Sequence, residues 1–206
     1  MKGAYKFVYR LLYGIVNFYF RLKFVGRENE PKEGAYLVCS NHISAADPLL
    51  ISAAMRRQVS YMAKKELFKI PILRGILKSV GVFPVDRGGK DVGAVKKAIA
   101  LLKEGNNVGI FPQGTRRPGV DPRLTDLKTG AAMIAIKADV DILPVFIHRK
   151  DNTPKPFRKT TVIVGKPIKL SSLGYDPDAS GEYHRIISAV FDEICKLGED
   201  FEKCQK

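Results

Sequence analysis

The alternation of short apolar runs with longer helical segments constrains this fold more than any other feature of the sequence. Six apolar runs, several of them bounded by Gly or Pro, indicate buried strands at residues 35–40, 58–63, 81–85, 107–112, 141–147 and 159–165. Apolar residues recur at helical spacing in five other segments, namely 47–57, 65–80, 91–105, 129–139 and 182–204. Strands that alternate with helices favour an α/β fold.

The length of the chain indicates one globular domain. With 206 residues, 45% of them hydrophobic, the chain is long enough to bury a sizeable core. No internal repeat and no low-complexity linker interrupts it. We therefore expect an N-terminal membrane-associating helix at residues 1–25 and an enzyme domain at residues 26–206.

The charge and cysteine content narrow the choice of partner and compartment. A formal charge of +14 favours an anionic partner, which is a nucleic acid, a phospholipid surface or an acidic substrate. The basic residues are scattered, Trp is absent and no nucleic-acid-binding motif occurs, so we expect no nucleic-acid partner. Three cysteines without close spacing indicate neither a disulfide framework nor a zinc site, and they fit a reducing cytosolic setting.

The N-terminal segment has the composition of a helix that lies on a membrane. Only ten uncharged residues separate Arg10 from Arg21, whereas a bilayer-spanning helix needs roughly 20 apolar residues. Aromatic side chains interleaved with lysines and arginines suit the headgroup layer of an anionic membrane. The alternative is a helix that caps the domain's own core.

Polar clusters follow several of the expected strands. The stretch SNHISAADP (40–48) carries His42 and Asp47, and two later strand ends carry Arg87 and Arg116. Ligands collect at the carboxyl ends of strands in open α/β sheets, so these turns are expected to converge on one site. A histidine oriented by a carboxylate is a general base, and arginines suit a phosphate. Taken singly, His42 is equally a structural hydrogen-bonding residue, and Asp47 before Pro48 is equally a helix N-cap.

Four blocks, in order across residues 35–147, resemble those of the glycerolipid acyltransferases, the family that contains the 1-acyl-sn-glycerol-3-phosphate acyltransferases. Asn41-His42 with Asp47 resembles the NHxxxxD block, and GVFPVDR (81–87) the block that ends in arginine. FPQGTR (111–116) resembles FPEGTR, and ILPV (142–145) resembles the fourth, proline-containing block. The resemblance implies a glycerol-3-phosphate acyltransferase-like fold, with a mixed, mostly parallel central sheet flanked by helices.

The resemblance also implies a reaction and the residues that serve it. His42 would act as general base, oriented by Asp47, on the free hydroxyl of lysophosphatidic acid, which attacks an acyl thioester of coenzyme A or acyl carrier protein. The residues implied at the substrate are Asn41, Arg87, Gln113, Gly114, Thr115, Arg116 and Pro144. The product would be phosphatidic acid, made without a metal or cofactor by a peripheral or monotopic protein at the cytoplasmic face of the cell membrane.

Gln113 departs from the family pattern, which has glutamate in the third block. Glutamine keeps the size and hydrogen-bonding capacity of glutamate and loses its charge. Four other functions remain open: an acyltransferase acting on another lysophospholipid, one acting on glycerol 3-phosphate, a serine hydrolase using Ser40 or Ser44, and a non-catalytic protein that binds lipid surfaces. The absence of a G-x-S-x-G elbow disfavours the hydrolase.

Overall fold

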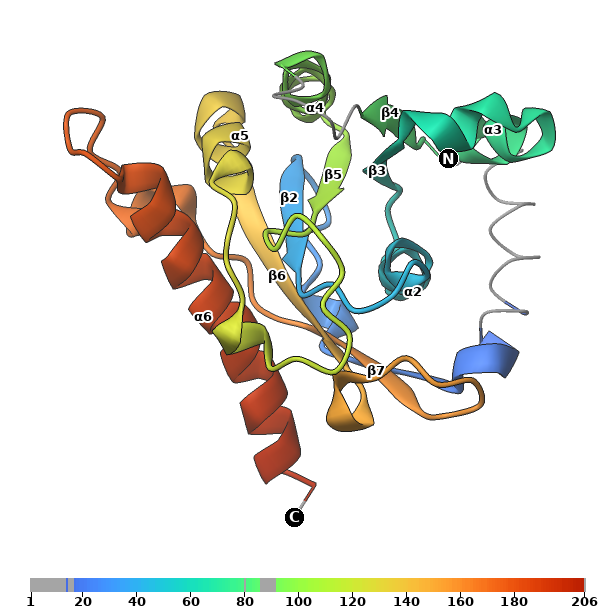
Figure 1. The fold of residues 1–206 in the computed structure, drawn as a ribbon. Helices are drawn as coiled ribbons and strands as arrows, with labels where there is room; N and C mark the ends of the chain where they lie inside the picture. The colour runs from blue at the N-terminus through green and yellow to red at the C-terminus, as the bar shows by residue number, and fades with distance from the viewer. Residues whose placement is uncertain (1–13, 15–16, 80, 86–91, 206) are drawn as a thin grey trace.

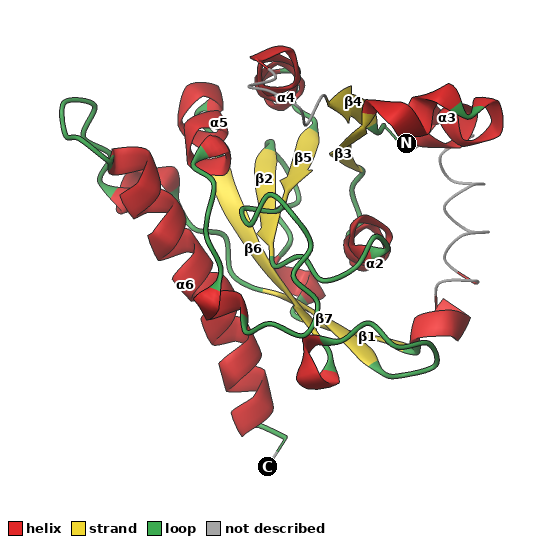
Figure 2. Cartoon of the chain, in the orientation of Figure 1, coloured by secondary structure: helices red, strands yellow, loops and turns green. Residues whose placement is uncertain are grey.

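The structure is a computed structural model that describes residue 14 and residues 17–79, 81–85 and 92–205. Its strands form one seven-stranded sheet with the order β1-β7-β6-β2-β5-β3-β4 (Figures 1 and 2). Neighbouring strands are parallel except β6 and β7, which are antiparallel. The predicted α/β fold with a mixed, mostly parallel sheet is therefore confirmed.

All six predicted strands are present, with bounds that differ by a few residues. They are β2 (Tyr36–Ser40), β3 (Val59–Lys64), β4 (Phe83–Val85), β5 (Asn107–Ile110), β6 (Asp141–His148) and β7 (Thr160–Val164). The helices are α2 (Asp47–Ala54), α3 (Pro71–Ser79), α4 (Val92–Lys103), α5 (Gly130–Ala138) and α6 (Glu182–Lys203). Short 3₁₀ helices lie in the connections between the strands and helices: η1 (Arg27–Asn29), η2 (Lys65–Lys69), η3 (Pro122–Leu124), η4 (Lys150–Asn152) and η5 (Leu170–Leu173).

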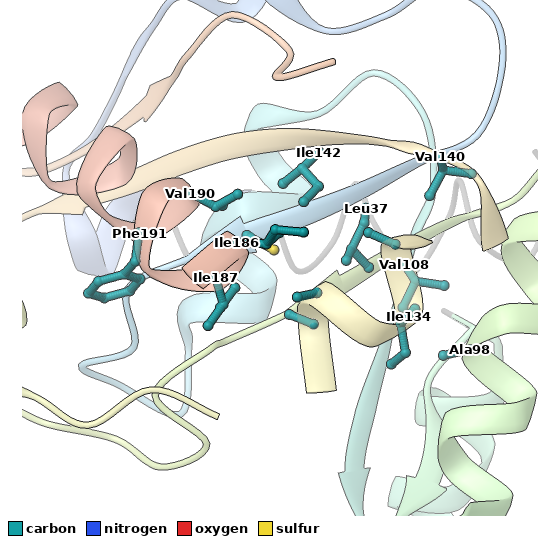
Figure 3. Packing of buried hydrophobic residues seen from close by; sticks show 14 of the residues in the cluster. Leu37, Ala98, Val108, Ile134, Val140, Ile142, Ile186, Ile187, Val190 and Phe191 are labelled. Carbon is teal, nitrogen blue, oxygen red and sulfur yellow. The ribbon is translucent and has the colours of Figure 1, made fainter. Parts of the chain in front are cut away.

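Helices cover both faces of the sheet, and each face has its own core. On one face, α4, α5 and α6 pack on residues that include Leu37 and Ile142; Figure 3 shows Ile186 and Ile187 of α6 in this cluster. On the other face, Leu50 and the rest of the apolar side of α2 pack on the alternate residues of β2, β6 and β7. The central strand β2 is buried on both faces along its whole length, which explains its continuous apolar run.

The N-terminal prediction is wrong at its C-terminal end. Residues 17–20 are helical, but Leu22–Val25 forms β1, which pairs in parallel with β7. Leu22 and Phe24 pack against the α2-side core while Lys23 between them is exposed, and this period of two is that of a strand. Most of the predicted membrane helix, residues 1–13 and 15–16, lies outside the described residues. Within the part of the chain that the structure describes, no helix is long and apolar enough to cross a membrane.

Candidate active site

The end of β2 is fixed to the neighbouring strand β6 by Asn41. Its side-chain Nδ2 donates to the carbonyl oxygen of Ile147 (3.1 Å), and its Oδ1 accepts from the Ile147 backbone N–H (2.8 Å). The Asn41 side chain is fully buried. It therefore continues the sheet by two hydrogen bonds beyond the last paired residue, Ser40, and fixes where the next residue, His42, begins.

His42 and Asp47 form the pair that the sequence predicts. The Nδ1 atom of His42 donates to Oδ2 of Asp47 at 2.9 Å, in a site where Asp47 is fully buried. The same carboxylate oxygen accepts the backbone N–H groups of Ile43 and Ser44, both at 2.7 Å. Because Nδ1 faces a carboxylate, it carries the ring proton and Nε2 carries the lone pair. Among the described residues Nε2 has no hydrogen-bond partner, and His42 lines a cavity.

The loop after β5 makes three contacts with His42. The side-chain oxygen of Gln113 accepts the His42 backbone N–H (2.7 Å), and the Arg117 backbone N–H donates to the His42 carbonyl oxygen (2.8 Å). The ring of Phe111 stacks on the imidazole with centroids 4.0 Å apart. These contacts exist because β2 and β5 are parallel neighbours, which brings both carboxyl ends to the same edge of the sheet.

Gln113 is buried and belongs to a directed chain of hydrogen bonds. Its Nε2 donates to the Thr125 hydroxyl oxygen (2.8 Å), and that hydroxyl donates to the carbonyl oxygen of Pro122 (2.6 Å). Each polar group of the Gln113 amide thus has a partner within the protein. Gln113, predicted to contact substrate, lines the cavity described below and also positions the backbone of His42.

A cavity of about 650 Å³ opens beside His42. Its inner wall is apolar and comes from strands β3, β4 and β5 and helices α4 and α5, with Tyr61, Met62, Val85, Ala94, Val95, Ala131 and Ile134 among the lining residues. Charged and polar groups of the loop that follows β5 lie in the same lining, namely Gln113, Thr115, Arg117, Asp126 and Lys128. The cavity therefore joins an apolar space to a polar region that contains two cations.

The predicted phosphate-binding residues lie in different places. Gly114 and Thr115 line the cavity, and Gly114 has a φ of +69°, a conformation that glycine adopts without strain. Arg116 is exposed and does not line the cavity, whereas Arg117 lines it and has a buried Nε atom without a hydrogen-bond partner. Arg87 lies outside the described residues.

Arg117 and Lys128 line the cavity but were not predicted from the sequence. The doubled arginine in TRRPG was the available signal for Arg117, but the choice between two adjacent arginines depends on the direction of the loop. No sequence motif marks Lys128. Its place beside the cavity depends on the fold of the loop, in which its backbone N–H donates to the Pro112 carbonyl oxygen (2.7 Å).

Pro144, also predicted at the substrate, is a buried residue within β6 and does not line the cavity. It stands opposite Cys39 of β2, and its carbonyl oxygen accepts the N–H of Gly165 (2.9 Å). These contacts give Pro144 a packing role in the sheet.

A third residue that was not predicted, Arg149, is a buried cation that interacts electrostatically with Asp47. It follows β6, is only 4% exposed, and donates through Nε to the Thr160 hydroxyl (3.0 Å) while its guanidinium stacks over the ring of Phe20 (4.8 Å). Both Nη atoms are buried without a hydrogen-bond partner, and so is Oδ1 of Asp47. Burial lowers the pKa of Arg149, and attraction to Asp47 partly offsets that shift. Arg149 thus compensates part of the buried negative charge of Asp47.

Among the described residues, neither of the neighbouring nucleophiles, Cys39 and Ser40, hydrogen-bonds to the His42 ring. Cys39 is fully buried, and desolvation raises the pKa of its thiol to about 12, so the reactive thiolate is suppressed. The Ser40 hydroxyl donates to the Asn41 carbonyl oxygen (3.1 Å), and among the described residues no serine hydroxyl bonds to His42. The same portion of the chain has no group of three His, Cys, Asp or Glu side chains placed to hold a metal ion.

Comparisons with known proteins identify the family. An acyltransferase family model matches residues 21–148. A 1-acyl-sn-glycerol-3-phosphate acyltransferase of Bacillus subtilis is 32% identical over 176 residues, which cover 84% of this chain and 86% of that protein. A protein of the same name from Borreliella burgdorferi is 36% identical over 129 residues, covering 62% of this chain and 51% of that protein.

The fold has a solved counterpart. The crystal structure of the 1-acyl-sn-glycerophosphate (LPA) acyltransferase PlsC from Thermotoga maritima matches with a TM-score of 0.68 and 26% identity, covering 94% of this chain and 78% of that one. The resemblance inferred from the four sequence blocks is therefore confirmed, and the chain belongs to the acyltransferase family.

Proposed function

We propose that this protein transfers a fatty acyl group from an acyl thioester to the free sn-2 hydroxyl of 1-acylglycerol 3-phosphate, giving phosphatidic acid. The observation that carries this proposal is the His42 imidazole, held through Nδ1 by Asp47 with Nε2 unpartnered beside a cavity that joins an apolar wall to cationic groups. The names of the Bacillus and Borreliella relatives support the same acceptor.

The proposed reaction is a direct transfer with His42 as general base. The acceptor oxygen attacks the thioester carbonyl carbon while its proton moves to Nε2 of His42. Asp47 stabilises the imidazolium that forms, through the Nδ1 hydrogen bond of 2.9 Å. The tetrahedral intermediate then collapses, the carbon–sulfur bond breaks, and the leaving thiolate takes the proton back from Nε2. No acyl-enzyme forms, which agrees with the suppressed thiolate of Cys39.

The two regions of the cavity suit the two parts of the substrates. The apolar wall, which includes Ala131 and Ile134, takes a fatty acyl chain, because burying methylene groups there removes them from water. Arg117 and Lys128 hold the acceptor phosphate, and the orphaned Nε of Arg117 supplies one donor. Thr115 supplies a hydroxyl beside them, while Arg116 and Arg87 remain candidates for a second contact. Asn41 and Gln113 act through His42, which they position.

The donor in this proposal is an acyl thioester of coenzyme A or acyl carrier protein, and the protein works at the cytoplasmic face of the cell membrane as a peripheral or monotopic protein. The +14 charge suits an anionic lipid surface and an anionic acceptor. Residues 1–21 remain the proposed anchor, since Leu22–Val25 of the predicted segment form β1.

The test is an acyl-transfer assay with purified protein, acyl-coenzyme A or acyl carrier protein thioester, and lysophosphatidic acid. We expect His42→Ala to lower turnover by at least about 10²-fold, the lower range for general base catalysis, while the exposed histidine variant His184→Ala keeps wild-type turnover. A His42→Ala variant with more than about a tenth of wild-type activity would overturn the assignment of the base.

A comparison of two arginine variants tests which residue binds the acceptor phosphate. Arg117→Ala should raise the KM for lysophosphatidic acid about tenfold or more, because a charged hydrogen bond to phosphate is lost, and should leave the KM for the thioester unchanged. Arg116→Ala, at the exposed neighbour, should have the smaller effect. A larger rise in this KM for Arg116→Ala than for Arg117→Ala would assign phosphate binding to Arg116.

A further inference from the structure

Three aromatic side chains gather on the surface where the N-terminal residues meet the β6–β7 connection. We name Phe18, Tyr19 and Phe157 the aromatic patch; their exposed fractions are 76%, 40% and 55%. The Phe157 ring lies 5.8 Å from that of Phe18, edge to face, and 5.4 Å from that of Tyr19. Figure 1 shows the connection that leads into β7 beside the short helical turn that precedes β1. Rings from two distant segments therefore form one exposed apolar surface.

The backbone holds Phe157 in this exposed position. Its φ is +57°, in the left-handed region that bulky residues rarely adopt, and its N–H donates to the Tyr19 carbonyl oxygen (2.8 Å). Such a conformation is energetically unfavourable for a bulky residue and persists where surrounding contacts impose it. A side chain of this size is thus held out of the core at an energetic cost.

Cations flank the aromatic patch. Lys155, Arg158 and Lys159 are exposed in the same connection, and Arg21 is exposed next to the helical turn. None of these four takes part in an ion pair between described residues. Asp151 is the acidic residue of the connection. The surface therefore combines exposed rings with unpaired positive charge.

We propose that the aromatic patch and its flanking cations dock on an anionic phospholipid surface, which makes the β6–β7 connection a membrane contact in addition to the N-terminal segment. The inference rests on the proposed function, since a protein that acylates a membrane lipid must reach the membrane. Aromatic rings favour the membrane–water interface, and each nearby Lys or Arg is attracted to anionic headgroups. A second copy of the chain would place like charges against each other, so its docking on this surface is disfavoured.

The experiment measures binding of the full chain to vesicles by flotation. The vesicles contain phosphatidylcholine with or without phosphatidylglycerol. The test variants are Phe157→Ser and the triple variant Lys155→Gln/Arg158→Gln/Lys159→Gln. The matched controls are Leu124→Ser, an 80% exposed apolar side chain on η3, and Lys96→Gln/Lys97→Gln, two exposed lysines on α4. Circular dichroism melting checks that each variant is folded.

The two test variants are expected to differ in which vesicles they bind less well. Phe157→Ser should lower the vesicle partition coefficient about tenfold or more on both lipids, because an apolar ring no longer enters the interface. The triple variant should lower it on the order of a hundredfold on the anionic vesicles only. Both controls should bind as the wild type. Wild-type binding by folded Phe157→Ser and triple variants would overturn the proposal, as would a loss of self-association without loss of vesicle binding.

A second readout separates this inference from the proposed function. With a short-chain, water-soluble lysophosphatidic acid, the two test variants should keep wild-type acyl transfer, since they leave the site at His42 intact. With acceptor embedded in anionic vesicles they should lose activity in proportion to binding. Absence of acyl transfer in the wild type would refute the proposed function and leave the flotation result standing.

Discussion

At the scale of single residues, Gln113 shows how the departure from the family's glutamate is accommodated. The hydrogen-bond chain runs in one direction, from the His42 N–H to Gln113, from Gln113 to Thr125, and from Thr125 to Pro122. A carboxylate at position 113 would also accept the His42 N–H, and the Thr125 hydroxyl would turn to donate to it instead of to Pro122. The geometry at His42 is therefore compatible with either residue.

Gln113→Glu should leave acyl transfer within about tenfold of the wild type, which is about 1.4 kcal/mol in barrier height. Gln113→Leu should lose more activity and about 1–3 kcal/mol of stability, because it strands the buried His42 N–H. Steady-state kinetics and urea unfolding measure the two effects. A gain of a hundredfold in Gln113→Glu would mean that the family carboxylate has a chemical role that this chain lacks.

At the scale of elements, the site depends on how β2 ends. Asn41 gives both hydrogen-bonding ends of its side chain to Ile147 of β6, so removing it leaves a buried N–H and a buried C=O unpaired. The sequence predicted Asn41 by its place in the NHxxxxD block, but the motif does not reveal that its partner is a backbone 106 positions away.

Asn41→Ala should lower the free energy of unfolding by about 2–6 kcal/mol, because it strands two buried groups at about 1–3 kcal/mol each. Asn29→Ala is the matched control, because Asn29 makes one side-chain bond to the Val164 carbonyl oxygen and is only half-buried, so it should cost about 1 kcal/mol. Urea denaturation of the three proteins provides the comparison. Equal costs for the two variants would contradict the role of Asn41 as a buried link between strands.

Some elements and site residues could be predicted from the sequence and others could not. Strands such as β2 and β6 were predictable, because a run buried on both faces leaves a continuous apolar signal. The edge strand β1 was missed, because its four residues follow an aromatic segment whose composition suits a helix equally well. His42 and Asp47 were predictable from local spacing. Arg117, Lys128 and Arg149 were not, because their positions depend on loop direction and on packing between distant segments.

At the scale of the whole molecule, the candidate active site lies where several segments meet. The local pair His42–Asp47 is five positions apart, whereas the groups that hold it come from 71 positions away in Gln113 and, through Asn41, from 106 positions away in Ile147. Pairing of β2 with both β5 and β6 brings these segments together. The two residues proposed as catalytic are thus close in sequence, whereas the residues that position them are distant in sequence.

This separation has a consequence for the order of folding. Contacts between residues far apart in the chain form late, because closing a long loop costs entropy before the contact compensates for it. A refolding chain should regain its helical circular dichroism before it regains acyl transfer, since the turn from His42 to Asp47 is correctly placed only after β5 and β6 flank β2. Enzymatic activity would then report the last stage of assembly.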